Sequence, residues 1–268
     1  MKKKLKPNLK PLVSIIMNCH NGEKFLKESL NSIINQTYFN WELIFWDNNS
    51  NDDSKNILKS FNDKRIFYYK SKKLLNLYHA RNLALKKIKG KYISFLDVDD
   101  LWTKNKLSKQ VNFLLRNEKI KVIYSNFFVL NQISKKKFLG YKRNSLPSGF
   151  ITQKLMNNYK LGILTTMLEK SILKLYKFKN KYNIIGDFDF FIRISKKFKI
   201  VCIQEPLAIY RIHNSNLTKT KVNLHIKELK EWLLNNKKLM KKLSISLVSF
   251  KISILKLKMR KYISFLGV

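Results

Sequence analysis

Short apolar runs alternate with helical segments along the first half of the chain. Five runs are rich in branched and aromatic residues and are typical of buried strands: 12–18, 42–47, 65–70, 91–97 and 120–130. The segments between them carry apolar residues three or four positions apart, which predicts helices over 23–36, 52–61, 76–90 and about 103–116. Gly90 is expected to close the third helix. Alternation at this length predicts a largely parallel sheet with right-handed crossovers and helices on both faces.

The second half of the chain is less regular. The elements expected there are a hairpin or exposed loop, a strand leading into a short helix, and a helix: 134–149, 162–171 and 186–198. Segment 199–213 predicts two final strands joined at Glu205 and Pro206. After about residue 217 the chain becomes Lys-rich and is expected to be helical, although strand-like alternation and helical spacing compete over 243–268.

The composition describes a folded and strongly basic protein. The 268 residues are 45% apolar, enough to offset the entropy of ordering the chain. The 55 Lys and Arg against 17 Asp and Glu invite a nucleic-acid-binding interpretation. The lysines are spread along the whole chain, however, without zinc-finger spacing, an aromatic RNA-binding motif or a basic-region heptad. We therefore expect most of them to form a solvated surface, and no specific nucleic-acid partner.

Cysteine usage and the N-terminal segment favour a cytoplasmic protein. Cys19 and Cys202 lie in apolar segments outside any Cys-x-x-Cys pair, so we expect reduced core residues rather than a disulfide. Residues 1–11 are basic but lack the apolar stretch of a signal peptide. No segment offers 18 consecutive apolar residues, so no membrane-spanning helix is predicted.

The scarce acidic residues are not spread evenly. Eight of the 17 fall in three short clusters: Asp47, Asp52 and Asp53; Asp97, Asp99 and Asp100; Asp187 and Asp189. Two clusters begin at the carboxyl ends of predicted parallel strands, which share the edge where open α/β sheets bind ligands. No Gly-rich phosphate loop is present, so a bound diphosphate would need another positive partner, and Asp oxygens recruit Mg²⁺ or Mn²⁺. Of Asp97 and Asp99, one can reach a sugar hydroxyl while the other binds the metal.

Several segments resemble those of one enzyme family. They are "VSIIMNCHNGEKFLKESLNSIINQTYFNWELIFWDNNSNDDS", "ARNLALKKIKGKYISFLDVDDLW", "GDFDFFIRI" and "YRIHNSNLT". In order and spacing they are similar to a family 2 glycosyltransferase of the GT-A fold, from about Pro11 to Thr218. The resemblance implies an α/β fold with a mixed, mostly parallel sheet flanked by helices. It implies a catalytic domain over 1–217, with a nucleotide-binding half over about 11–110 and an acceptor half over about 111–217, before a basic helical extension over 218–268.

The resemblance also implies donor-binding roles. Asp47 would bind the nucleotide base or ribose, Arg81 would lie near the base, and Asp97 and Asp99 would form a DxD motif with Asp99 on the metal. His20 stands where the family commonly has Tyr, and its ring can still stack on a base. From the residues alone, Asp47 can instead be a turn residue and Arg81 a surface charge of a helix, and we expect Asp100 to cap the next helix rather than bind the ligand.

For catalysis, the resemblance implies inversion at the sugar with one general base, which maps onto Asp187. Gly186 stands where a Glu is usual. The alternative makes Asp187 an N-cap and Asp189 a partner of the helix dipole, and we favour Asp187 over Asp189 as the base. Arg211 and His213 resemble the loop that closes over the diphosphate, where a cation compensates the departing charge and His213 approaches the metal.

The sequence therefore predicts a metal-dependent inverting glycosyltransferase. Its donor would be a nucleotide-diphosphate sugar, its acceptor a glycan or a lipid-linked sugar, and its setting the synthesis of a cell-surface polysaccharide. The competing hypothesis is a basic nucleic-acid-binding or scaffold protein that keeps the fold without turnover. The tail with Trp232, Leu233, Leu239 and Met240 is expected either to lie on an acidic membrane face or to pack on the catalytic domain.

Overall fold

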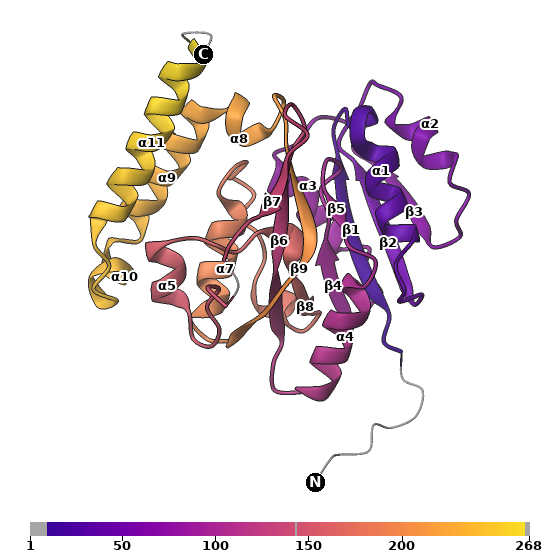
Figure 1. Cartoon of the computed structure of the whole chain (residues 1–268), viewed down its shortest axis with the longest axis horizontal. Coiled ribbons are helices and arrows are strands. Elements are labelled where there is room, and N and C mark those ends of the chain that lie inside the picture. The colour runs from indigo at the N-terminus through magenta and orange to yellow at the C-terminus, as the bar shows by residue number, and fades with distance from the viewer. Residues whose placement is uncertain (1–9, 143, 266–268) are drawn as a thin grey trace.

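The computed structural model describes residues 10–142 and 144–265, and its strands form one mixed sheet (Figure 1). The described strands are β1 (Val13–Cys19), β2 (Trp41–Asp47), β3 (Ile66–Lys70), β4 (Tyr92–Phe95), β5 (Leu101–Trp102), β6 (Val122–Asn131), β7 (Lys137–Leu139), β8 (Met167–Glu169) and β9 (Ile200–Ile212). They are ordered β3-β2-β1-β4-β8-β6-β9-β5, and β7 pairs with β6. The pairs β3-β2, β2-β1 and β1-β4 are parallel, as predicted, whereas β8 is antiparallel to both β4 and β6.

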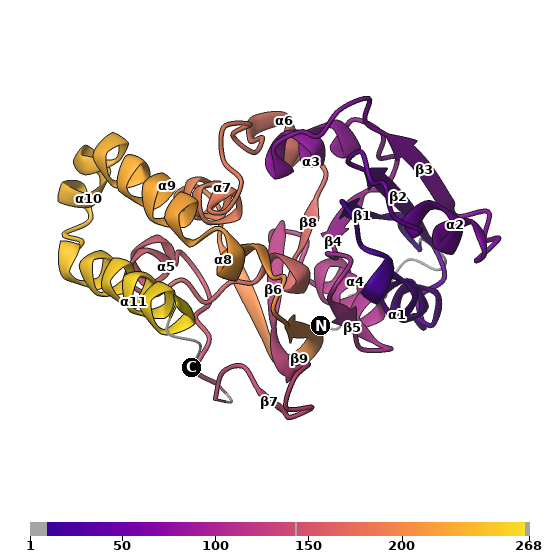
Figure 2. The ribbon, with the colours of Figure 1, turned by 90° about the horizontal axis from the view of Figure 1, so that it is seen from above.

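Helices cover both faces of the sheet (Figure 2). They are α1 (Glu23–Ile34), α2 (Ser54–Lys59), α3 (Leu77–Leu85), α4 (Lys106–Arg116), α5 (Thr152–Asn157), α6 (Ile172–Leu175), α7 (Gly186–Ser195), α8 (Leu217–Thr220), α9 (Val222–Asn235), α10 (Lys237–Lys242) and α11 (Leu247–Phe265). One core contains residues of α1, α2 and α4, and the other contains residues of α3, α5, α7 and α9. Every residue of β1 and β2 is buried, which explains why these strands are continuous apolar runs rather than alternating ones.

Two predicted element boundaries are wrong. Segment 199–213 forms one strand, β9, rather than two strands joined at Glu205 and Pro206. Two register shifts in its parallel pairing with β6 absorb Pro206, which has no N–H to donate. Helix α3 ends at Leu85, before Gly90; a Cβ on Gly90 would lie 2.6 Å from the backbone nitrogen of Ser14, so the glycine permits close approach to β1.

The C-terminal extension is helical, as predicted, and it packs against the rest of the protein. Trp232 and Met240 are buried in the core that also holds α3 and α7. Leu233 and Leu239 pack partly buried against the same core, so these residues do not face outward to a membrane. Segment 243–268, for which two patterns compete, contains helix α11, which lies beside α9 in both views (Figures 1 and 2). Within the described residues, none of the helices has both the length and the apolar character needed to span a bilayer.

Candidate active site

The carboxyl ends of β1, β2 and β4 place the predicted donor-binding residues along one edge of the sheet. Register pairs Cys19 of β1 with Asp47 of β2, so His20 follows directly beside Asp47. His20 is exposed, whereas Asp47 is buried at the last position of β2. The Asp47 carboxylate accepts hydrogen bonds from the Ser50 backbone N–H at 2.7 Å and from the Tyr68 hydroxyl at 2.7 Å. Asp47 therefore organises the turn after β2, and its oxygens keep lone pairs for a ligand.

Arg81 is an internal residue, so its interpretation as a surface charge is wrong. Its side chain is 2% exposed, and its Nη2 donates to Asp97 Oδ1 at 2.7 Å. The guanidinium also lies 5.1 Å from the Tyr78 ring centroid. Asp97 is one-third exposed, and burial raises the pKa of its carboxyl, with Arg81 opposing and the charge of Asp99 adding to the effect. Arg81 thus fixes the orientation of Asp97 while leaving one of its oxygens toward solvent.

Asp187 lies in the first turn of α7, near Arg81. Its Oδ1 accepts hydrogen bonds from the Phe188 N–H at 2.8 Å and from the Tyr78 hydroxyl at 3.1 Å. Burial raises the pKa of Asp187 to about 6, against the opposing effects of the Phe188 N–H, the Arg81 charge and the Tyr78 hydroxyl. A carboxylate with this pKa is ionised at neutral pH and is more basic than an ordinary one, which suits a general base.

The alternatives for α7 are resolved by its geometry. The helix has Ile185 at its N-cap, so Asp187 is not the cap. Asp189 is 1% exposed and bound to three donors, with distances of 2.8 Å to Lys179 Nζ, 2.8 Å to Arg193 Nε and 3.0 Å to Trp232 Nε1. Asp189 is therefore a buried structural anion rather than a group open to substrate.

Gly186 explains how Tyr78 reaches this helix. A Cβ at Gly186 would lie 2.2 Å from Cδ2 of the Tyr78 ring, far inside van der Waals contact. The glycine that stands in place of the usual acidic residue thus leaves room for Tyr78, which links Arg81 and Asp187.

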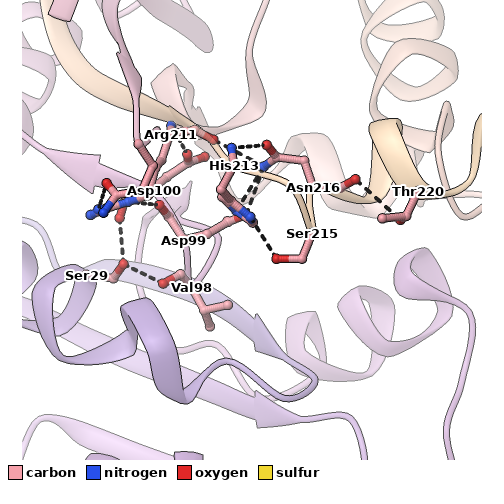
Figure 3. A network of polar contacts seen from close by, with 10 residues as sticks. Ser29, Val98, Asp99, Asp100, Arg211, His213, Ser215, Asn216 and Thr220 are labelled. Atoms are coloured by element: carbon pink, nitrogen blue, oxygen red, sulfur yellow. Dashed lines mark hydrogen bonds and ion pairs between the residues drawn. The ribbon is translucent and has the colours of Figure 1, made fainter. Parts of the chain in front are cut away.

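Asp99 and His213 meet across the sheet edge (Figure 3). His213 follows β9, and its Nε2 lies 2.9 Å from Asp99 Oδ2, while its Nδ1 lies 2.8 Å from Ser215 Oγ. Asn216 holds the loop, because its Oδ1 accepts from the His213 backbone N–H at 2.6 Å and its Nδ2 donates to the Arg211 carbonyl at 3.1 Å. Two residues 114 positions apart therefore present an oxygen and a nitrogen at one point.

The Asp99–His213 pair fits a divalent cation as two of its ligands. The 2.9 Å between His213 Nε2 and Asp99 Oδ2 is a hydrogen-bond distance, and it brings a nitrogen and a carboxylate oxygen close enough that both would be available to one divalent ion. A ring proton on Nδ1, donated to Ser215, would leave Nε2 with a lone pair for a metal ion. No cluster of three or more His, Cys, Asp or Glu that could hold a metal occurs among the described residues. An ion held by this pair would take its remaining ligands from water and phosphate oxygens, as is usual for Mg²⁺-type sites.

Arg211 is buried beneath this pair rather than open to a ligand. Its side chain is 2% exposed, and its three guanidinium nitrogens donate to Glu28 Oε2 at 2.6 Å, Gln132 Oε1 at 2.9 Å and the Asp99 carbonyl at 2.8 Å. The guanidinium also lies over the Phe25 ring, 4.6 Å from its centroid. In this structure Arg211 therefore has internal partners, among them the backbone of Asp99.

Asp100 is not a helix cap, contrary to the prediction. Helix α4 begins at Lys106, whereas the buried Asp100 carboxylate accepts the backbone N–H of Arg211 at 2.9 Å. Burial and the charges of Asp99 and Asp97 raise the pKa of Asp100. Ser29 Oγ lies 2.6 Å from the Val98 carbonyl and 2.7 Å from the Asp100 carbonyl (Figure 3). These contacts fix the turn that carries Asp99.

Sequence reasoning missed Glu228, which lies in the C-terminal extension and supports the start of the helix that carries Asp187. The carboxylate of this α9 residue is buried and accepts backbone N–H groups of Asn183, Ile184 and Ile185 at 2.7, 2.9 and 3.1 Å. These groups directly precede the first turn of α7. The one available signal was scarcity, since residues 218–268 contain just two acidic residues, Glu228 and Glu231.

Comparison with known proteins identifies this arrangement. The profile described as glycosyl transferase family 2 matches residues 14–189, more than half of the chain. The chain belongs to glycosyl transferase family 2. Over 225 residues it is 33% identical to the UDP-Glc:alpha-D-GlcNAc-diphosphoundecaprenol beta-1,3-glucosyltransferase WfgD of Escherichia coli, covering 82% of this chain and 84% of that one. It is also 28% identical to the putative teichuronic acid biosynthesis glycosyltransferase TuaG of Bacillus subtilis, covering 80% and 84% of the two chains. Family membership confirms the predicted glycosyltransferase activity.

Solved structures confirm the predicted GT-A fold. The fold matches S. aureus TarS 1-349 in complex with UDP with a TM-score of 0.63 at 19% identity, over 81% of this chain and 65% of that one. It matches the mannosyltransferase PcManGT of Pyrobaculum calidifontis, in complex with GDP-Man and Mn²⁺, with a TM-score of 0.62 at 13% identity, over 86% and 66% of the two chains. The chain thus spans about two thirds of the length of these proteins, and the likeness concerns their fold.

Proposed function

We propose that this glycosyltransferase moves a sugar from a nucleotide-diphosphate donor to a lipid-linked or glycan acceptor during assembly of a cell-surface polysaccharide. Two relatives support this acceptor class, since the name of WfgD specifies a diphosphoundecaprenol-linked GlcNAc and that of TuaG teichuronic acid biosynthesis. The observation that carries the proposal is the convergence of acidic residues from distant segments: Asp97 and Asp187 lie near Arg81, and Asp99 faces His213.

The donor is proposed to bind along the edge formed by β1, β2 and β4. Asp47 would accept from the base or ribose, next to the exposed ring of His20, which can stack on the base. Asp97 would accept from a ribose or sugar hydroxyl, with Arg81 orienting its carboxylate from behind. Because Arg81 is buried, we assign it an indirect part in donor binding.

The diphosphate is proposed to lie against Asp99 and His213. These two residues would hold Mn²⁺ or Mg²⁺ together with phosphate oxygens, and PcManGT in complex with Mn²⁺ is a structural neighbour that supports a divalent ion. When bound, the ion offsets negative charge on the leaving diphosphate. We assign Arg211 to positioning, because its guanidinium and backbone N–H hold Asp99 and Asp100 and its side chain is 2% exposed.

The acceptor is proposed to react at Asp187. The acceptor oxygen bonds to the anomeric carbon while its proton passes to the Asp187 carboxylate, and the bond from that carbon to the diphosphate oxygen breaks, with its electron pair leaving on the diphosphate. This single displacement inverts the anomeric configuration. Tyr78 and the Phe188 N–H hold the accepting carboxylate in place.

A screen of UDP, GDP and dTDP sugars with Mn²⁺ tests the proposal, read as release of the nucleoside diphosphate in the presence of lipid-linked sugar acceptors. Asp99→Ala should abolish turnover with the active donor. Asp63→Asn is the matched control, because Asp63 pairs with Arg65 before β3, away from the strand ends that form the site. Strong, salt-dependent polynucleotide binding together with no turnover of any donor would instead support the scaffold hypothesis.

A further inference from the structure

Helix α11 has one face packed on the protein and one apolar face without a partner among the described residues. Phe250 and Leu257 are buried, and the Phe250 ring stacks on that of Trp232 at 6.2 Å between centroids. Five large apolar side chains of α11 are instead about half exposed: Leu247 51%, Val248 58%, Ile252 46%, Leu255 57% and Met259 55%. Packing on α9 therefore buries the apolar residues on one side of α11 and leaves those on the other side exposed.

Four of the exposed residues form a continuous stripe. Val248, Ile252, Leu255 and Met259 are separated by four, three and four positions. At 3.6 residues per turn they fall within a sector of about 60°, and Phe250 and Leu257 lie on the opposite side. A contiguous apolar stripe that no described part of the fold covers marks an interaction surface.

Lysines border the stripe on both sides. On the same helical wheel Lys251 and Lys258 lie about 70–90° to one side of the centre of the stripe, and Lys256 lies about 70° to the other. All three are exposed, and residues 232–268 contain no acidic residue that could neutralise them. An apolar stripe flanked by cations on both sides, two on one and one on the other, is the arrangement of a helix that lies in the interface of an anionic membrane.

We propose that the outer face of α11 binds the surface of an anionic lipid bilayer, with the stripe among the acyl chains and the lysines at the headgroups. Charge complementarity favours this occupant over a second copy of the chain, because an antiparallel pair of α11 helices would place lysines against lysines. Figure 1 places the carboxyl end of α11 at the same end of the molecule as α8, which follows the His213 loop. A membrane-bound α11 thus keeps the site within reach of a lipid-linked acceptor.

Vesicle sedimentation of the full chain tests this proposal. We expect binding to vesicles of phosphatidylcholine with about one third phosphatidylglycerol, and at least tenfold weaker binding to phosphatidylcholine alone. Ile252→Ser with Leu255→Ser should weaken binding at least tenfold, and Lys251→Gln about fivefold. Leu175→Ser with Ile133→Ser is the matched control, because these residues are as exposed but lie elsewhere. Turnover of donor with a water-soluble acceptor should stay unchanged, which separates this proposal from the proposed function.

A fluorescence measurement covers the case in which the serine variant fails to fold. Both native cysteines are buried, so Leu255→Cys can be labelled selectively with an environment-sensitive dye. Addition of the anionic vesicles should shift its emission to the blue, whereas the same label at Leu175→Cys should not respond. No shift at position 255, equal binding to neutral vesicles, or a stable dimer that the Ile252→Ser change dissociates without any vesicle binding would overturn the proposal.

Discussion

Glu228 of α9 accepts the backbone N–H of Ile184 at 2.9 Å, in the turn that precedes the helix carrying Asp187. The same carboxylate accepts the N–H groups of Asn183 and Ile185. These N–H groups belong to the N-cap residue Ile185 and to the two residues before it, and the buried carboxylate satisfies all three at once. The C-terminal extension is therefore a structural part of the active site, although the family profile ends at residue 189.

Glu228→Ala should lower the free energy of unfolding by about 3 kcal/mol, because it leaves buried donors unsatisfied. Urea denaturation measures that loss, and kcat should fall because the first turn of α7 loses its anchor. Glu231→Gln is the matched control on the same helix, since its pair with Lys181 is exposed and should contribute nothing measurable. A Glu228→Ala protein with native stability and native kcat would contradict the role assigned to the extension.

Asp187→Asn should raise the melting temperature at pH 7.5. The pKa of Asp187 is raised to about 6 in the folded protein, so the folded state binds this proton more tightly than the unfolded one. The stabilisation from that proton is gained as pH falls through 6, and above pH 6 the ionised carboxylate destabilises the fold. The neutral Asn removes that destabilisation, and the difference between the two proteins should vanish below about pH 4.

Asp63→Asn is the control with the opposite sign for the same measurement. The hydrogen bond from Arg65 is the main reason that the pKa of Asp63 is lowered, so its ionised form stabilises the folded state at neutral pH. This substitution should lower the melting temperature at pH 7.5. If the melting temperature shifted in the same direction and by the same amount in both variants, burial would not be raising the pKa of Asp187.

Tyr78→Phe should move the acid limb of the pH–kcat profile to higher pH. The Tyr78 hydroxyl lowers the pKa of Asp187 by donating to its carboxylate, so its removal should raise that pKa further. Tyr182→Phe is the control, since the Tyr182 hydroxyl is buried without a hydrogen-bond partner within the described residues. If the acid limb in Tyr78→Phe stays at the wild-type pH, the group that titrates in the pH–kcat profile is not Asp187.

Binding of Mn²⁺ should depend on the nucleotide. We propose that Asp99 and His213 supply two ligands, so electron paramagnetic resonance should detect Mn²⁺ binding at least about tenfold tighter with UDP or GDP present than without. Asp99→Ala should abolish the nucleotide-dependent component and His213→Ala should weaken it about tenfold, while Asp63→Ala leaves it unchanged. Tight Mn²⁺ binding by Asp99→Ala would place the ion elsewhere.

The first half of the fold could be predicted from the sequence because its central strands are buried on both faces. Continuous apolar runs mark β1, β2 and β4, and the polar residues that follow these runs include Asp47, Asp97 and Asp99. These residues are far apart in sequence, but their proximity could still be predicted because the carboxyl ends of parallel strands meet at one edge of the sheet.

The remaining features depend on contacts that no local pattern encodes. Arg211 and Arg81 look like ordinary charges in sequence, and they are internal because acidic or carbonyl partners from distant segments satisfy them. Trp232 suits a membrane face as well as a core, and its contact with the Phe188 ring at 4.8 Å decides between them. In the sequence, Pro206 predicts a strand break because proline cannot donate to a sheet ladder. The strand continues because register shifts opposite β6 accommodate Pro206, and the sequence around Pro206 does not show that pairing.

The pH dependence of kcat for sugar transfer by the wild-type protein and by Asp187→Asn tests the central claim most directly. The account predicts that wild-type kcat falls as pH decreases through about 6, the pKa of Asp187. Asp187→Asn should lose about 10²- to 10⁴-fold in kcat without that titration, while donor binding is retained. An Asp187→Asn enzyme that keeps more than about a third of wild-type kcat, with the same acid limb, would contradict the assignment of Asp187 as the base.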